Sequence, residues 1–244
     1  MAVKRSQSAS RVLAIFELVA AHQPIGVSAL AKLIDDDRSA VQRAVLTLAD
    51  AGWIRLAPEA PVRWELSAHI FTIASLPDSI SQLRQRARAT LESLRQQTGE
   101  TVYLAVPDAT RFVVVEALES AHALRMSSRV GMVIEPHLSS TGRAVLPYLD
   151  DAAQALMLGH DPTVEDRAAF AATRARGYGL SAGEVLPGAT NVAAPIFGTR
   201  GEPIAALVVS GPSDRLTPER HDDVGALVAH AAASLSRGRL APAA

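Results

Sequence analysis

Residues 27–52 read VSALAKLIDDDRSAVQRAVLTLADAG, and this stretch decides the fold of the first part of the chain. A short run with helical apolar spacing is broken by three consecutive aspartates, and a longer run follows. Asp accepts hydrogen bonds from the free N–H groups at helix starts, so Asp37 is expected to cap the second helix. The stretch predicts a helix-turn-helix, with Ser28 capping the first helix and Gly52 ending the second.

The second predicted helix has two different faces. Apolar residues at helical spacing mark the buried face: Val41, Ala44, Val45 and Leu48. The opposite face carries Arg38, Ser39, Gln42 and Arg43. Arg can pair bidentately with guanine and Gln with adenine, while Ser suits phosphate oxygens. This face fits a recognition helix in a major groove, although the solvated side of an ordinary amphipathic helix has a similar composition.

Two short β-prone runs follow the helix-turn-helix, at residues 53–56 and 62–66, around a Pro-containing turn at 57–61. They predict a hairpin, and a hairpin in this place is the wing of a winged-helix domain. Arg55 and Arg63 on this wing are expected to follow a sugar-phosphate backbone and to add affinity that weakens with salt.

The segment before the helix-turn-helix is expected to form a helix from Ser8 to His22, capped by Ser8 or Ser10. Its helical apolar spacing has Leu13 on the buried face, and Glu17 argues against a signal peptide.

Composition limits the class of protein. The 244 residues allow two domains, and the absence of cysteine excludes disulfides and thiolate metal sites and fits a reducing cytoplasm. The formal net charge of −1 counts against a generic nucleic-acid binder, although basic residues gather in the first quarter of the chain. No window approaches the roughly 18 apolar residues that cross a membrane. We therefore expect a cytoplasmic protein without a membrane partner.

The rest of the chain mixes helices and strands, which predicts an α+β domain. A linker helix is expected at 67–76, ending before Pro77. The predicted division is a winged helix-turn-helix domain at 1–66, a linker at 67–78 and a second domain at 79–244. Helices are expected at 79–98, 142–149, 151–158, 164–176 and 217–236. Strands are expected at 101–106 and 112–117, as a hairpin at the edge of the sheet, and at 123–127, 191–197 and 203–210.

Several segments, in their order and spacing, resemble the IclR-type bacterial transcriptional regulators over nearly the whole chain. They are SASRVLAIFELVA at 8–20, QRAVLTLADAGW at 42–53, TGETVYLAV at 98–106, the run from Gly131 through SSTGRAVL, the stretch 175–197, and IAALVVSGP at 204–212 followed by Arg215. The resemblance implies a winged-helix head and a GAF-like C-terminal domain that binds a small effector. It also implies dimers, or dimers of dimers, that bind palindromic double-stranded operator DNA as repressors or activators.

The same resemblance implies an effector site. It assigns the ligand-facing segment to Ser140 and Thr141, with Ser139 adjacent, where hydroxyls at a helix start suit a carboxylate but equally suit an ordinary cap. It assigns further contacts to Ser181, Asn191, Val208 and Ser210, with Met126 and Ile134 as apolar walls. Val208 stands where family members can have a second Ser. This change favours an aromatic or other larger carboxylate-type effector over a two-carbon oxoacid.

Enzyme motifs are present only as fragments. Residues 179–183, GLSAG, match the G-x-S-x-G nucleophile elbow, and Asp214 and His221 follow in hydrolase order. However, no strand pattern precedes Ser181, and Pro187 interrupts any long helix after it. A loose dinucleotide fingerprint at 177–182 follows a helix-like segment instead of a strand, and the histidines lack metal-ligand spacing. We therefore expect no catalysis, cofactor or metal. The alternatives are a hydrolase using Ser181, or a sensor module with a degenerate DNA-binding head.

Overall fold

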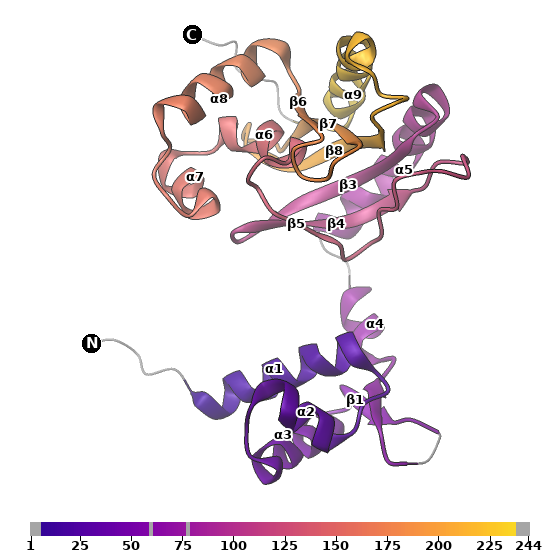
Figure 1. Cartoon of the computed structure of the whole chain (residues 1–244), viewed down its shortest axis with the longest axis vertical. Coiled ribbons are helices and arrows are strands. Elements are labelled where there is room, and N and C mark those ends of the chain that lie inside the picture. Colours follow the sequence, from indigo (N-terminus) through magenta and orange to yellow (C-terminus); the bar gives the residue numbers. More distant parts are fainter. Residues whose placement is uncertain (1–5, 59–60, 77–78, 238–244) are drawn as a thin grey trace. The chain divides into compact units, whose positions relative to one another are not determined.

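The computed structural model describes residues 6–58, 61–76 and 79–237, and the chain divides into two compact units after residue 77. Figure 1 shows a mainly helical first unit and a second unit built around a sheet. No helix in the described ranges is long and apolar enough to cross a membrane.

The first unit contains the predicted helix-turn-helix. Helix α1 spans Gln7–His22, α2 spans Val27–Ile34 and α3 spans Arg38–Asp50. The Asp37 side chain accepts a hydrogen bond of 2.9 Å from the backbone N–H of Ala40, so the predicted cap of α3 is confirmed. Gly52 follows the helix with φ +81°, a conformation that glycine adopts without strain.

Two predicted caps are wrong, and one apolar residue that was expected on a buried face is exposed. Helix α1 is capped by Ser6, which lies one residue before the helix, and α2 starts after Gly26 without a side-chain cap, so Ser28 lies inside it. Leu13 is 63% exposed. Helical spacing shows which residues share a face, but only the neighbouring elements decide which apolar face is covered.

The predicted wing is present as the antiparallel pair β1, Ile54–Leu56, and β2, Trp64–Leu66. Positions 59–60 of the predicted turn lie outside the described residues. Ile54 and Trp64 join the core of the first unit, whose other members include Ile15, Val19, Leu30, Val41, Val45 and Leu48. The predicted linker helix is shorter than expected, since α4 spans only His69–Ala74.

The second unit has strands in the order β5-β4-β3-β8-β7-β6, and every neighbouring pair is antiparallel. The strands are β3 Thr101–Asp108, β4 Arg111–Leu118, β5 Val133–Ile134, β6 Gly179–Ala182, β7 Ala189–Phe197 and β8 Pro203–Pro212. The helices are α5 Ser79–Thr98, α6 Ser140–Val145, α7 Asp151–Leu158, α8 Val164–Arg176 and α9 His221–Leu235, with 3-10 turns at Leu146–Tyr148 and Pro218–Arg220.

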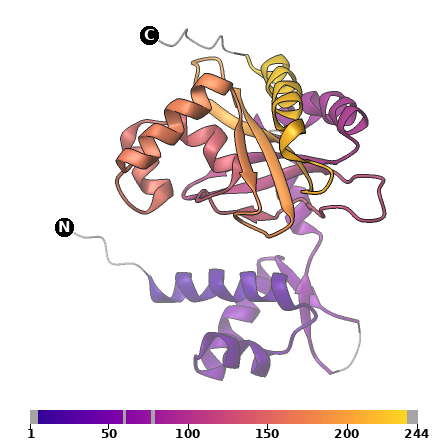
Figure 2. The same cartoon turned by 45° about the horizontal axis from the view of Figure 1, so that its top comes forward.

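Helices cover the two faces of this sheet separately. Helices α5 and α9 lie side by side on one face, as Figure 2 shows, and α6 lies on the other. Side chains alternate along each strand, so Val102 and Leu104 of β3 face α5 and α9, whereas Tyr103 and Ala105 face the α6 side. The α6 side is the one that holds the candidate effector residues.

The sheet differs from the prediction at its edges. Residues 123–127 form no strand, and this exposed segment is held by side chains such as Arg125, which bonds Glu119 at 2.8 Å. Strands β5 and β6 were missed, so the β3–β4 hairpin is not at the edge of the sheet, because β5 lies outside it. Such short segments are extended because a neighbouring strand pairs with them, and their own residue preferences give little signal.

Candidate DNA interface and effector site

The predicted recognition face of α3 lies on the surface. Arg38, Ser39, Gln42 and Arg43 are all exposed, whereas Val41 is fully buried. The helix therefore presents two arginines, an amide and a hydroxyl in one direction, a set that can contact base edges and phosphates.

A cleft of about 500 Å³ adjoins this face. It is lined by residues 24–29 at the start of α2, by Arg38 and Gln42 of α3, and by Pro61, Val62 and Arg63 before β2. Arg38 and Arg63 form no ion pair within the described parts of the chain. Ser28, predicted only as a cap, lines the same cleft. The cleft thus combines two uncompensated cations with a hydroxyl.

Charges around the head are partly paired. Arg55 of the wing forms an ion pair of 2.8 Å with Glu65 on the adjacent strand, so less of its charge is available than that of Arg63. Arg11 bonds Asp36, and this bond holds the pKa of Asp36 below its usual value. Pairing with Arg11 reduces the repulsion that the aspartate run would exert on a polyanion.

In the second unit, three of the predicted effector residues lie in one row across the sheet. Ser181 of β6 is the register partner of Asn191 of β7, and Asn191 is the partner of Ser210 of β8. Ser210 in turn pairs with Thr101 of β3, which sequence reasoning did not single out. Directly paired residues project on the same face, so these four side chains form a polar row. Val208 lies two residues before Ser210 and shares this face.

Helix α6 lies against the same region. Gly179 permits the close approach, because a Cβ atom there would be 2.4 Å from the carbonyl oxygen of Ser140. The Ser139 hydroxyl accepts from the N–H of Gly142 at 3.0 Å and donates to the Pro136 carbonyl at 3.1 Å, so it serves as the helix cap. Ser140 and Thr141 are buried and lie within α6, which starts two residues earlier than predicted.

Two buried hydroxyls at this place have no hydrogen-bond partner among the described residues: Thr141 Oγ1 and Ser181 Oγ. An unsatisfied buried polar atom costs about 1–3 kcal/mol, and a bound water or ligand is the common explanation. Burial also raises the pKa of Tyr103 to about 12. The neighbouring Thr141 hydroxyl reduces this rise in part, although it lies near Tyr103 without forming a hydrogen bond. Tyr103 therefore remains protonated at neutral pH.

Arg143 of α6 is fully engaged beside Ser181. It binds the Glu184 carboxylate bidentately, at 2.6 and 2.7 Å, and donates to the Leu180 carbonyl at 2.6 Å. The bond from Arg143 makes the largest contribution to holding the pKa of Glu184 below its usual value. The Ser181 hydroxyl makes a smaller one by lying near this carboxylate, although it is outside hydrogen-bond geometry. Since the pair is neutral overall, Arg143 does not bring an uncompensated charge to the polar row.

The predicted apolar walls differ in their contacts. Ile134 of β5 is half-buried and packs against the core on the α6 side. Met126 is half-buried in the loop after β4, and its carbonyl accepts a hydrogen bond of 2.6 Å from Thr101 Oγ1.

The hydrolase motif has no supporting geometry. Ser181 lies within strand β6 instead of on a strand-to-helix turn, and the His221 ring is bonded to the Leu216 carbonyl. In the parts of the chain that the structure describes, no cluster of three or more His, Cys, Asp or Glu side chains is arranged to hold a metal ion.

Comparison with known families gives two matches. The model of the IclR helix-turn-helix domain matches residues 8–58, and that of the bacterial transcriptional regulator IclR C-terminal domain matches residues 79–237. The chain belongs to the IclR family. It is therefore a DNA-binding transcriptional regulator with an effector-binding domain, and not an enzyme.

Relatives support this assignment along the chain. The transcriptional repressor IclR of Escherichia coli K12 is 30% identical over 240 residues, which cover 93% of this chain and 87% of the relative. The acetate operon repressor of Salmonella typhimurium is 29% identical over 240 residues, with the same coverage of 93% and 87%.

Solved structures share the fold. The IclR of Thermotoga maritima has a TM-score of 0.71 at 21% identity, covering 94% of this chain and 97% of that one. An IclR homologue from Microbacterium hydrocarbonoxydans, complexed with 4-hydroxybenzoate, has a TM-score of 0.78 at 22% identity, covering 94% and 98%.

Proposed function

We propose that this regulator binds a palindromic operator as a dimer or dimer of dimers, and that a small organic effector changes its affinity for that operator. Residues 1–66 are the proposed DNA-binding head, 67–78 the linker and 79–244 the effector domain. An effector acts by binding one arrangement of the protein more tightly than another, so it shifts their populations. Acting on chromosomal DNA implies a cytoplasmic protein.

The proposed DNA contacts are those of the exposed face of α3 and the wing. Arg38, Ser39, Gln42 and Arg43 contact the major groove, and Arg55 and Arg63 follow the backbone. The support is the separation of this exposed face from the buried one, together with the unpaired Arg38 and Arg63 in the adjoining cleft.

The observation that carries the effector proposal is the pair of buried, unpartnered hydroxyls, Thr141 Oγ1 and Ser181 Oγ, on the α6 face of the sheet. The proposed hydrogen-bonding set is Ser140, Thr141, Ser181, Asn191 and Ser210, with Met126, Ile134 and Val208 supplying apolar contact. Ser139 supports the site as a cap. We propose an aromatic or other carboxylate-type effector, and the 4-hydroxybenzoate bound by the Microbacterium homologue makes this compound the first probe.

The test is fluorescence anisotropy of the full chain on DNA from upstream of its own and neighbouring genes, at several salt concentrations. Titrations are repeated with 4-hydroxybenzoate and a panel of aromatic and aliphatic acids. Tight, sequence-selective binding that one acid alters is the expected result. Equal binding to all sequences, insensitive to every acid, would overturn the proposal and favour a sensor module with a degenerate head.

A further inference from the structure

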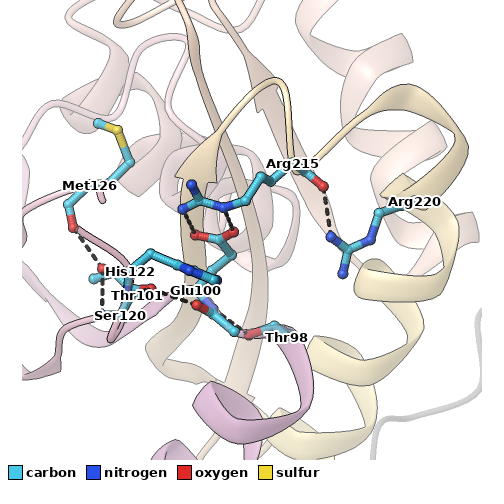
Figure 3. Close-up of polar contacts among 9 residues, drawn as sticks. Thr98, Glu100, Thr101, Ser120, His122, Met126, Arg215 and Arg220 are labelled. Carbon is cyan, nitrogen blue, oxygen red and sulfur yellow. Dashed lines mark hydrogen bonds and ion pairs between the residues drawn. The ribbon is translucent and has the colours of Figure 1, made fainter. Parts of the chain in front are cut away.

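Thr101 is the fourth member of the polar row, but its hydroxyl is fully used. Thr101 Oγ1 donates to the carbonyl of Met126 at 2.6 Å and accepts from the backbone N–H of Ser120 at 3.1 Å. Figure 3 shows Thr101 between these two residues of the 119–130 loop, which connects β4 to β5. The loop therefore bonds to a side chain that stands in register with Ser210.

The start of this loop is fixed to the same end of β3. The Ser120 hydroxyl donates to the Gly99 carbonyl at 2.6 Å and accepts from the N–H of His122 at 3.2 Å. Behind it, the buried Glu100 receives a bidentate pair of bonds from Arg215, also drawn in Figure 3. Thr101 thus projects from a rigidly held part of the sheet.

Farther along, the loop depends on Thr101. Among the described residues, the bond from Thr101 to Met126 is the hydrogen bond that ties residues 121–130 to this end of β3, and the ion pair of Arg125 with Glu119 is internal to the loop. Replacing the hydroxyl by a methyl group leaves both the Met126 carbonyl and the Ser120 N–H without this partner.

We propose that Thr101 is a positioning residue of the effector site, whose hydroxyl holds the 119–130 loop closed over the Thr101 end of the polar row, next to Ser210. This inference rests on the proposed effector site. Thr101 acts through the loop: it holds the backbone of Met126 at its own side chain, which is in register with Ser210, and so limits access to the row.

The absence of cysteine from the chain permits a direct test of access. Ser210→Cys introduces one thiol at a position that is 3% exposed, and its alkylation by iodoacetamide is timed in the full chain. Adding Thr101→Val is expected to raise the alkylation rate about ten-fold, because two hydrogen bonds of the closed loop are lost. Adding Thr101→Ser, which keeps the hydroxyl, is expected to preserve the slow rate.

Thr190→Val is the matched control. Thr190 is equally buried and its hydroxyl bonds Ser213 at 2.9 Å, but it neighbours Asn191 in β7 and so faces away from the row. A second reporter, Ala232→Cys on the buried face of α9, measures global unfolding. Equal acceleration at both reporter positions, or no acceleration at position 210, would overturn the proposal.

The operator assay separates this proposal from the proposed function. Thr101→Val is expected to raise the acid concentration that half-alters operator binding while leaving ligand-free operator affinity unchanged. Faster alkylation with an unchanged half-effective concentration overturns the positioning role. If no acid acts on the parent chain, the effector proposal fails, and the alkylation rates still decide whether Thr101 controls access to the row.

Discussion

At the scale of single residues, the hydroxyls of Ser181 and Thr141 are buried without a hydrogen-bond partner among the described residues. A fold selected only for stability would place methyl groups there, since an unpaired buried hydroxyl is unfavourable. Retaining them is reasonable if a ligand completes their hydrogen bonds.

Ser181→Ala is accordingly expected to leave the free energy of unfolding unchanged or to raise it by up to about 1 kcal/mol, while weakening the response to the effector. Urea unfolding without ligand and operator titration with 4-hydroxybenzoate measure the two effects. Ser139→Ala is the contrasting variant: its hydroxyl caps α6, so it should lose about 1 kcal/mol. A clear loss of stability in Ser181→Ala would show that its hydroxyl has a structural partner.

Arg43 is a second single residue with a testable effect, because one exposed guanidinium can distinguish guanine from the other bases. Arg43→Ala is expected to cost about 1–3 kcal/mol of specific operator binding and to relax specificity at one position. Anisotropy on matched and mutated operators measures this, with the highly exposed Arg200 of the second unit replaced by Ala as control. Equal operator affinity in Arg43→Ala and its parent would contradict the assigned recognition face.

At the scale of elements, the contact of α6 with β6 positions the proposed effector residues. Gly179 is where the helix meets the strand, and a Cβ atom there would also lie 2.6 Å from the backbone nitrogen of Ala144. Backbone atoms on both sides leave nothing flexible to yield, so α6 and its hydroxyls would have to shift.

Gly179→Ala is therefore expected to lower the free energy of unfolding by about 1–3 kcal/mol and to abolish the effector response. Chemical unfolding and operator titration test both effects. Gly26→Ala is the steric control, because the nearest atom to its Cβ would be 3.7 Å away. Since Gly26 precedes α2 as its N-cap, this variant should lose at most about 1 kcal/mol, without any clash. Unaltered stability in Gly179→Ala would mean that α6 moves freely on the sheet.

Elements also show what the sequence could predict. The long periodic segments, such as α5 and α8, were predicted with their observed bounds because an amphipathic stripe and clear end signals agree. Strand β6 has only GLSA, with no alternation to distinguish it from a turn, and its pairing with β7 makes it a strand. The role of Thr101 was equally invisible, since its partners Ser120 and Met126 are set by the path of an irregular loop.

At the scale of the whole molecule, stability is expected to fall at both ends of the pH range. The pKa values of Glu184 and Glu119 are lowered by hydrogen bonds from Arg143 and Arg125. A lowered folded-state pKa gives a stabilisation that is present above the unfolded value and lost as pH falls through the folded one, hence below about pH 4.

At the alkaline end, stability is lost as the pH rises. Burial raises the pKa of Tyr103 to about 12 in the folded chain, above the unfolded value of about 10. Its contribution to the free energy of unfolding is therefore complete below about pH 10 and is lost as pH rises from there through the folded value. Urea midpoints measured from about pH 3 to 11 should therefore show a plateau between these limits. Above about pH 10, the Tyr103→Phe variant should lose less stability than the unsubstituted chain. Below about pH 4, the two should lose stability equally. Identical alkaline limbs would mean that the pKa of Tyr103 is the same in the folded and the unfolded chain, and hence that water reaches its hydroxyl on the α6 side of the sheet.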